Sequence, residues 1–109
     1  MYQINGETLA TDEAGFLQDH TLWSPALAQI IAQTLNIELT EEHWPVLELL
    51  RTLYIEFDLA PANRGLVKIV GQKLGPEKGN SIYLMSLFGG SPAKDAARIA
   101  GLPKPPHCL

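Results

Sequence analysis

The C-terminal end of the chain is the part whose conformation the sequence constrains most strongly. Prolines stand at three of the four positions 103–106, directly before His107 and Cys108. Proline cannot continue a helix and lacks the N–H group that a sheet ladder requires, so this segment favours extended polyproline II. At ~3.1 Å per residue, the six steps from Leu102 to Cys108 span roughly 19 Å. We therefore expect residues 101–109 to form a semi-rigid, extended C-terminal arm.

Cys108 is the only cysteine among the 109 residues. A cysteine near a frayed chain end is often incidental. The prolines before it favour a second interpretation, in which a nucleophilic sulfur is held on a tether that enters another protein's active site. One cysteine cannot form an internal disulfide, and the first residues contain neither a basic region nor an apolar signal core. We therefore expect a soluble cytoplasmic protein in a reducing compartment.

Charge is divided unevenly along the chain. Residues 1–50 contain eight acidic residues and no lysine or arginine, whereas residues 51–109 contain all eight basic residues and four acidic ones. The two parts carry −8 and +4, which together give the net charge of −4. A basic half beside a thiol can steer an anionic partner or stabilise a thiolate, or the two halves can simply pair with each other. No run of eighteen apolar residues occurs, so no membrane span is expected.

Turn and cap residues predict an α+β, mainly helical fold. Asn5-Gly6, between residues 2–4 and 8–10, is the signature of a β-hairpin. Serine–proline pairs and glycines then mark helix starts and stops. We expect Phe16 and Leu17 to anchor the core, and about five helices at residues 24–35, 40–57, 61–74, 78–88 and 91–100.

Two of these helices carry an ambiguity. Pro45 lies within the second predicted helix, where it predicts either a kink or a separate turn over residues 40–44. The fourth helix has two apolar faces, either of which could turn toward the core: Ile82, Met85 and Phe88, or Tyr83, Leu84 and Leu87.

No linker is long enough to separate domains, so we expect a single domain over residues 1–109. It comprises a hairpin region (1–22), an orthogonal, helix-turn-helix-like bundle (24–100) and the arm (101–109). Such a bundle makes a nucleic-acid-binding or regulatory module an alternative function. Residues 78–90 contain only one basic residue, Lys78, so we expect no direct DNA binding.

The cations near the proposed arm are candidate site residues. Arg64 and Lys68 lie four apart and share a helix face, which is either simply solvated or binds the arm or a persulfide anion. Arg98 and Lys104 flank the root of the arm. Lys104 and His107 favour a Cys108 thiolate, while the terminal carboxylate opposes it. The sign of the net pKa shift is therefore open.

The sequence offers little support for metal or cofactor chemistry. The three histidines are scattered, and one cysteine cannot build a thiolate cluster. His107 and Cys108 are adjacent in an extended segment and point in opposite directions, which disfavours a catalytic dyad. Glycine-rich nucleotide-binding motifs do not occur. We expect neither a metal nor a cofactor.

Several short motifs, spread over nearly the whole chain, form a familiar pattern. They are Glu42-His43-Trp44-Pro45-Val46, Arg51, Tyr54, Glu56-Phe57, Arg64-Gly65-Leu66-Val67-Lys68, Lys78-Gly79-Asn80-Ser81, Leu87-Phe88 and Ala100 through Cys108. Together they resemble the DsrC/TusE family of sulfur-relay proteins. The resemblance implies a small protein with an N-terminal hairpin, an orthogonal helical bundle and a mobile C-terminal arm.

The family divides over a second cysteine, at the position that Ala97 occupies here. The dissimilatory sulfite-reductase branch closes a disulfide between its two thiols, which a chain with Ala97 cannot do. The resemblance therefore implies the TusE-like branch, a sulfurtransferase-type carrier rather than a stand-alone turnover enzyme. Cys108 would receive sulfur as a persulfide from a TusBCD-like complex and pass it to a tRNA thiolase acting on the wobble uridine, which would itself contact the tRNA. Service in another sulfur pathway is a further alternative.

Overall fold

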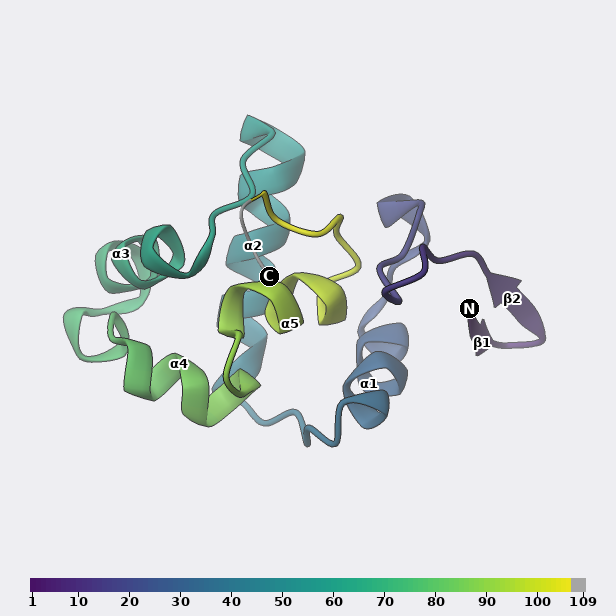
Figure 1. Cartoon of the computed structure of the whole chain (residues 1–109), viewed down its shortest axis with the longest axis horizontal. Helices are drawn as coiled ribbons and strands as arrows, with labels where there is room; N and C mark the ends of the chain where they lie inside the picture. The colour runs from purple at the N-terminus through teal and green to yellow at the C-terminus, as the bar shows by residue number, and fades with distance from the viewer. Residues whose placement is uncertain (107–109) are drawn as a thin grey trace.

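The computed structural model describes residues 1–106, which form a two-stranded β-hairpin and five α-helices (Figure 1). This architecture confirms the predicted fold class. The elements are β1 (Tyr2–Ile4), β2 (Glu7–Leu9), the 3₁₀ turn η1 (His20–Leu22), α1 (Pro25–Thr34), α2 (His43–Phe57), α3 (Asn63–Leu74), the 3₁₀ turn η2 (Pro76–Lys78), α4 (Ser81–Phe88) and α5 (Pro92–Ile99).

The N-terminal hairpin forms where Asn5-Gly6 predicts it. The strands are antiparallel, with Tyr2 opposite Leu9. Asn5 and Gly6 both have positive φ, at 50° and 80°, as a tight two-residue hairpin turn requires. The second strand begins at Glu7, one residue earlier than expected. Tyr2 and Leu9 are buried and join the core, which β1 reaches by packing against α1.

The start of α2 corrects a prediction. The helix begins at His43 and not at Thr40, because residues 40–43 form a turn closed by a 3.0 Å bond from the His43 N–H to the Thr40 carbonyl. Pro45 is then the third residue of the helix. N–H groups in the first turn have no intrahelical acceptor, so proline sacrifices no backbone hydrogen bond there. Of the two alternatives predicted for Pro45, the separate turn is therefore confirmed, one residue shorter than expected, and the kink is not needed.

The start of α4 is also later than expected, at Ser81 instead of Lys78. The Asn80 side chain caps the helix by accepting a 2.7 Å bond from the Tyr83 N–H, while Lys78 ends the preceding turn η2. Ile82 is 82% exposed, so the predicted face containing it is wrong. The other predicted face points inward, together with Phe88: Tyr83 and Leu87 are half-buried, and Leu84 and Phe88 are fully buried.

The short helix α5 lies at the centre of the bundle, in contact with α1, α2, α3 and α4 (Figure 1). Its buried residues are mostly alanines, including Ala93, Ala96 and Ala97, and such small side chains allow neighbouring helices to approach closely. Ala93 also donates its N–H to the Asn63 side chain of α3 at 2.8 Å. Phe16 and Leu17 are buried, which confirms both as core anchors. None of the helices in residues 1–106 has the length and apolar character needed to cross a membrane.

Candidate functional site at the root of the arm

The end of α5 is where the C-terminal arm begins. Gly101 has a φ of +72°, a left-handed conformation that ends the helix. Its N–H bonds to the Arg98 carbonyl at 3.1 Å, and the Leu102 N–H bonds to the Ala97 carbonyl at 3.0 Å. Leu102 is only 3% exposed. The root of the arm is thus built into the core, and residues 103–106 continue from it outside any helix or strand.

Two side chains from distant parts of the sequence bind the last carbonyls of α5. The indole Nε1–H of Trp23 donates to the Ile99 carbonyl at 2.8 Å. The Arg51 guanidinium donates from Nη1 to the Ala100 carbonyl at 2.8 Å, and from Nη2 to the His20 carbonyl at 3.2 Å. The same guanidinium stacks over the Trp23 ring, 4.3 Å from its centroid. Carbonyls that α5 leaves without intrahelical partners are thereby satisfied.

No carboxylate in the described residues pairs with the Arg51 guanidinium. Within residues 1–106, the one ion pair closer than 4.0 Å joins Lys78 and Glu42. Burial lowers the pKa of Arg51 because desolvation disfavours its cation. Two carbonyls, an aromatic face and the negative end of the α5 dipole compensate for that cost.

The structure separates the predicted cations into two groups. Arg98 is half-buried, with its guanidinium carbon 4.9 Å from the centre of the Phe16 ring, so it faces the N-terminal segment. Arg64 and Lys68 are exposed on α3, and Lys104 is exposed in the arm. None of these four side chains has a hydrogen bond or ion pair to another described residue. His107 and Cys108 lie outside the described residues.

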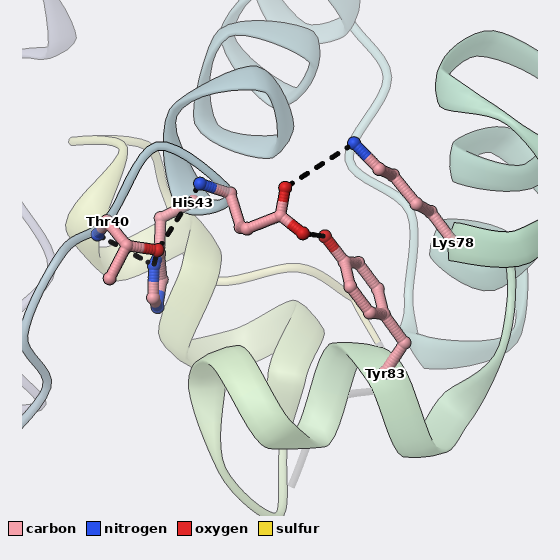
Figure 2. Close-up of polar contacts among 5 residues, drawn as sticks. Thr40, His43, Lys78 and Tyr83 are labelled. Atoms are coloured by element: carbon pink, nitrogen blue, oxygen red, sulfur yellow. Dashed lines mark hydrogen bonds and ion pairs between the residues drawn. The ribbon is translucent and has the colours of Figure 1, made fainter.

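A second polar cluster ties the start of α2 to α4 and the turn before it (Figure 2). Tyr83 donates its hydroxyl to Glu42 at 3.1 Å, and Lys78 approaches the other oxygen of that carboxylate at 3.7 Å. His43 lies deeper and is 4% exposed. Its Nδ1 accepts from the Thr40 N–H at 3.0 Å, and its Nε2 lies 2.7 Å from the Leu87 carbonyl. Because a carbonyl only accepts, Nε2 carries the hydrogen.

Sequence reasoning did not single out Trp23, Arg51 or His43 for these contacts. Each one bonds to a carbonyl 44 to 76 positions away, and no local pattern reports a contact of that range. One signal was present for Arg51. It lies four residues after Leu47 and directly follows Leu50, so a cation borders the apolar stripe of its helix.

Over residues 1–106, no three His, Cys, Asp or Glu side chains gather closely enough to hold a metal ion. The candidate site is thus the root of the arm, where a proline-rich segment leaves the helical bundle at residues fixed by hydrogen bonds.

Comparison with known proteins places the chain in a family. The family profile described as "DsrC like protein" matches residues 3–109, and the chain belongs to this family. It is 52% identical to the sulfurtransferase TusE of Pectobacterium atrosepticum, with both chains covered completely.

Solved structures agree. The NMR structure of Allochromatium vinosum DsrC superimposes with a TM-score of 0.90 at 51% identity, covering 99% of this chain and 96% of that one. The oxidised γ-subunit of dissimilatory sulfite reductase (DsrC) from Archaeoglobus fulgidus gives 0.83 at 43% identity, covering 98% and 97%. The family that the sequence resembles is confirmed, and so is the implied fold of a hairpin and a helical bundle.

Proposed function

We propose that this protein is a sulfur carrier that holds sulfane sulfur as a persulfide on Cys108 and delivers it toward 2-thiolation of the tRNA wobble uridine. The observation that carries the proposal is the placement of the only thiol, six residues beyond a buried and hydrogen-bonded root at Leu102. Membership of the DsrC-like family and the similarity to proteins named sulfurtransferase TusE support it.

The chemistry is two successive exchanges at sulfur. In loading, the Cys108 thiolate attacks the outer sulfur of a donor persulfide, a new S–S bond forms, and the donor leaves as a thiolate. In delivery, an acceptor thiolate attacks the outer sulfur held on Cys108, and Cys108 leaves as a thiolate. One S–S bond forms and one breaks in each step, so no external oxidant or reductant is required.

Position 97 favours the tRNA branch over the sulfite-reductase branch. Overall identity does not separate the two, because it is 52% to a TusE and 51% to a DsrC. Ala97 lies buried on α5, and no second thiol exists in the chain to form a disulfide with Cys108. A single-thiol carrier passes sulfur onward as a persulfide, which is the chemistry that a thiolation relay needs.

The partners that we propose are a TusBCD-like donor complex and a tRNA thiolase that itself contacts the tRNA. The charge of this chain supports indirect contact with tRNA. Helix α4 contains no lysine or arginine, and Lys78 just before it is paired with Glu42. A direct nucleic-acid binder needs several free cations for phosphate contacts.

Loading and delivery can be tested separately. Incubation with inorganic polysulfide should add one sulfur to the intact mass of the wild-type protein and none to Cys108→Ser. In a Salmonella typhimurium strain lacking its own TusE, the wild-type chain should restore 2-thiouridine in tRNA, and Cys108→Ser should not. Equal loading of both proteins would refute the carrier. Selective loading without restored 2-thiouridine would place the carrier in another sulfur pathway.

We also propose that Arg64, Lys68, Arg98, Lys104 and His107 support the arm or the partner surface. Charge reversal at Arg64 or Lys68 should lower 2-thiouridine in the same strain without moving the thermal midpoint, because both side chains are exposed. Lys73→Glu, on a different face of α3, is the matched control. An equal effect of all three reversals would show that net charge, and not this face, matters.

A further inference from the structure

We propose that Trp23 and Arg51 are positioning residues that fix the direction in which the C-terminal arm leaves α5. The inference rests on the proposed carrier function, because it concerns the direction of the arm that carries the thiol and not the chemistry of the thiol. Together with the Ile99 and Ala100 carbonyls that they bind, these two side chains are called the root clamp.

The root clamp acts on consecutive residues at the point where the chain leaves the helix. Trp23 holds the Ile99 carbonyl, and Arg51 holds the Ala100 carbonyl, both at 2.8 Å. Gly101 follows immediately and turns the chain with its φ of +72°. Successive peptide groups are thus held from outside α5, one from the segment after η1 and one from α2. The orientation of the last peptide plane determines the direction of the segment that follows it.

Trp23 also packs directly against the turning residue. A Cβ placed on Gly101 would lie 2.4 Å from Cδ1 of the indole, so the ring occupies the space that any side chain there would need. Arg51 in turn holds that ring in place by stacking over it at 4.3 Å and by bonding to the His20 carbonyl. Contacts from the η1 region and from α2 therefore constrain the peptide groups from which the arm starts.

The polar character of the root clamp fits a role in orienting the arm better than a role in packing alone. Apolar side chains of similar volume would bury the same surface without a desolvated cation. Hydrogen bonds to carbonyls depend on direction, whereas apolar contacts do not. Arg51 uses its donors on two backbone carbonyls, so the charge serves to fix main-chain geometry between elements.

The test measures the direction of the arm without any sulfur chemistry. Spin labels at Lys104→Cys in the arm and Gln29→Cys on α1, both exposed positions, are placed in the full chain carrying Cys108→Ser. Their distance distribution is compared among the parent, Trp23→Phe and Arg51→Lys. Trp44→Phe, the same change at the half-buried tryptophan of α2, is the matched control. Amide hydrogen exchange of the same variants without labels reports local opening.

Trp23→Phe and Arg51→Lys should each broaden or shift the distance distribution. Protection of the Ala100, Gly101 and Leu102 amides should fall roughly two- to tenfold, as expected for one lost hydrogen bond, with protection elsewhere retained. Trp44→Phe should do neither. If Trp23→Phe does not fold, Arg51→Lys decides. An unchanged distribution, or an even loss of protection over all helices, would overturn the proposal while leaving the carrier function to its own test.

Discussion

Helix α2 is tied to the C-terminal half of the chain at two places that differ in burial. At Arg51 the ties are a guanidinium bonded to backbone carbonyls and stacked on an indole. At Glu42, just before the helix begins, the ties are a carboxylate, an ammonium and a phenol near solvent. Both places join α2 to segments at least 30 residues away in sequence, through polar side chains.

The comparison teaches that burial decides how much a polar tie contributes. Glu42 is half-exposed, so its Coulombic attraction to Lys78 is weakened by water and by salt. At Arg51 one acceptor is the carbonyl of the fully buried Ala100, and removing the guanidinium leaves that carbonyl without its donor. The His20 carbonyl would keep the Trp23 N–H at 3.3 Å. The contacts of Glu42 should therefore be dispensable for folding, whereas those of Arg51 should not.

The largest effect is expected from Gly101→Ala, which attacks the root clamp directly. The substitution places a Cβ 2.4 Å from the Trp23 ring and forces a non-glycine residue into left-handed backbone. We expect a loss of about 2–4 kcal/mol in the free energy of unfolding, measured by urea denaturation.

Two other glycines separate the causes of that loss. Gly89 also has positive φ, but a Cβ there meets nothing within 4 Å, so Gly89→Ala should show the backbone term alone, about 1–2 kcal/mol. Gly90 has neither constraint, and Gly90→Ala should change stability by less than about 1 kcal/mol. If Gly101→Ala costs no more than Gly89→Ala, the tight contact with Trp23 is unimportant.

Arg51→Met is expected to have the next largest effect. Methionine retains much of the apolar stem but leaves the Ala100 carbonyl without its donor and the His20 carbonyl with only the Trp23 N–H at 3.3 Å. We expect a loss of about 2–3 kcal/mol, measured by urea denaturation. Arg51→Lys should lose less because it keeps the charge and one donor. If Arg51→Met costs as little as Glu42→Gln, burial does not decide how much a polar contact contributes to stability.

The elements of this fold that the sequence predicted are those with local causes. Asn5-Gly6 specifies the hairpin because both residues tolerate positive φ, and Ser24 caps α1 by accepting from the Leu27 N–H three residues on. The helix starts are less well predicted: the turn before α2 is one of two alternatives predicted for Pro45, and α4 begins three residues later than expected. There the boundary depends on a turn over residues 40–43 and on the cap at Asn80, which compete with the helical pattern around them.

The same distinction, between features with local causes and features that depend on distant contacts, applies to the candidate site. The importance of the lone Cys108 follows from composition and from the prolines before it, which are properties of the sequence itself. The root of the arm does not, because the bonds of Trp23 and Arg51 link positions 76 and 49 residues apart. The position of Arg98 over Phe16 likewise depends on how the N-terminal segment packs against α5.

His43 extends the comparison, because its buried contacts lie next to the exposed contacts of Glu42. Its ring bridges the Thr40 N–H and the Leu87 carbonyl and packs edge-on against Phe88. His43→Phe should keep the aromatic packing and lose both hydrogen bonds, with an expected cost of about 1–2 kcal/mol by urea denaturation. A cost near zero would show that water replaces both hydrogen bonds. Burial of the ring would then not decide how much these bonds contribute to stability.

The smallest effect is expected from Glu42→Gln at the exposed place. It removes the charge that attracts Lys78 while keeping an acceptor for the Tyr83 hydroxyl, so stability should fall by less than about 1 kcal/mol, and by less still in 1 M salt.

Desolvation, and then the bond to Glu42, raise the pKa of Tyr83. Since the folded pKa is above the unfolded value of about 10, the corresponding stability is present below pH 10 and is lost as the pH rises through the folded pKa. Glu42→Gln should lower the pKa of Tyr83, which a tyrosine absorbance titration measures against a Tyr83→Phe reference. A salt-independent loss as large as that of Arg51→Met would show that the exposed carboxylate stabilises the fold as strongly as the half-buried guanidinium.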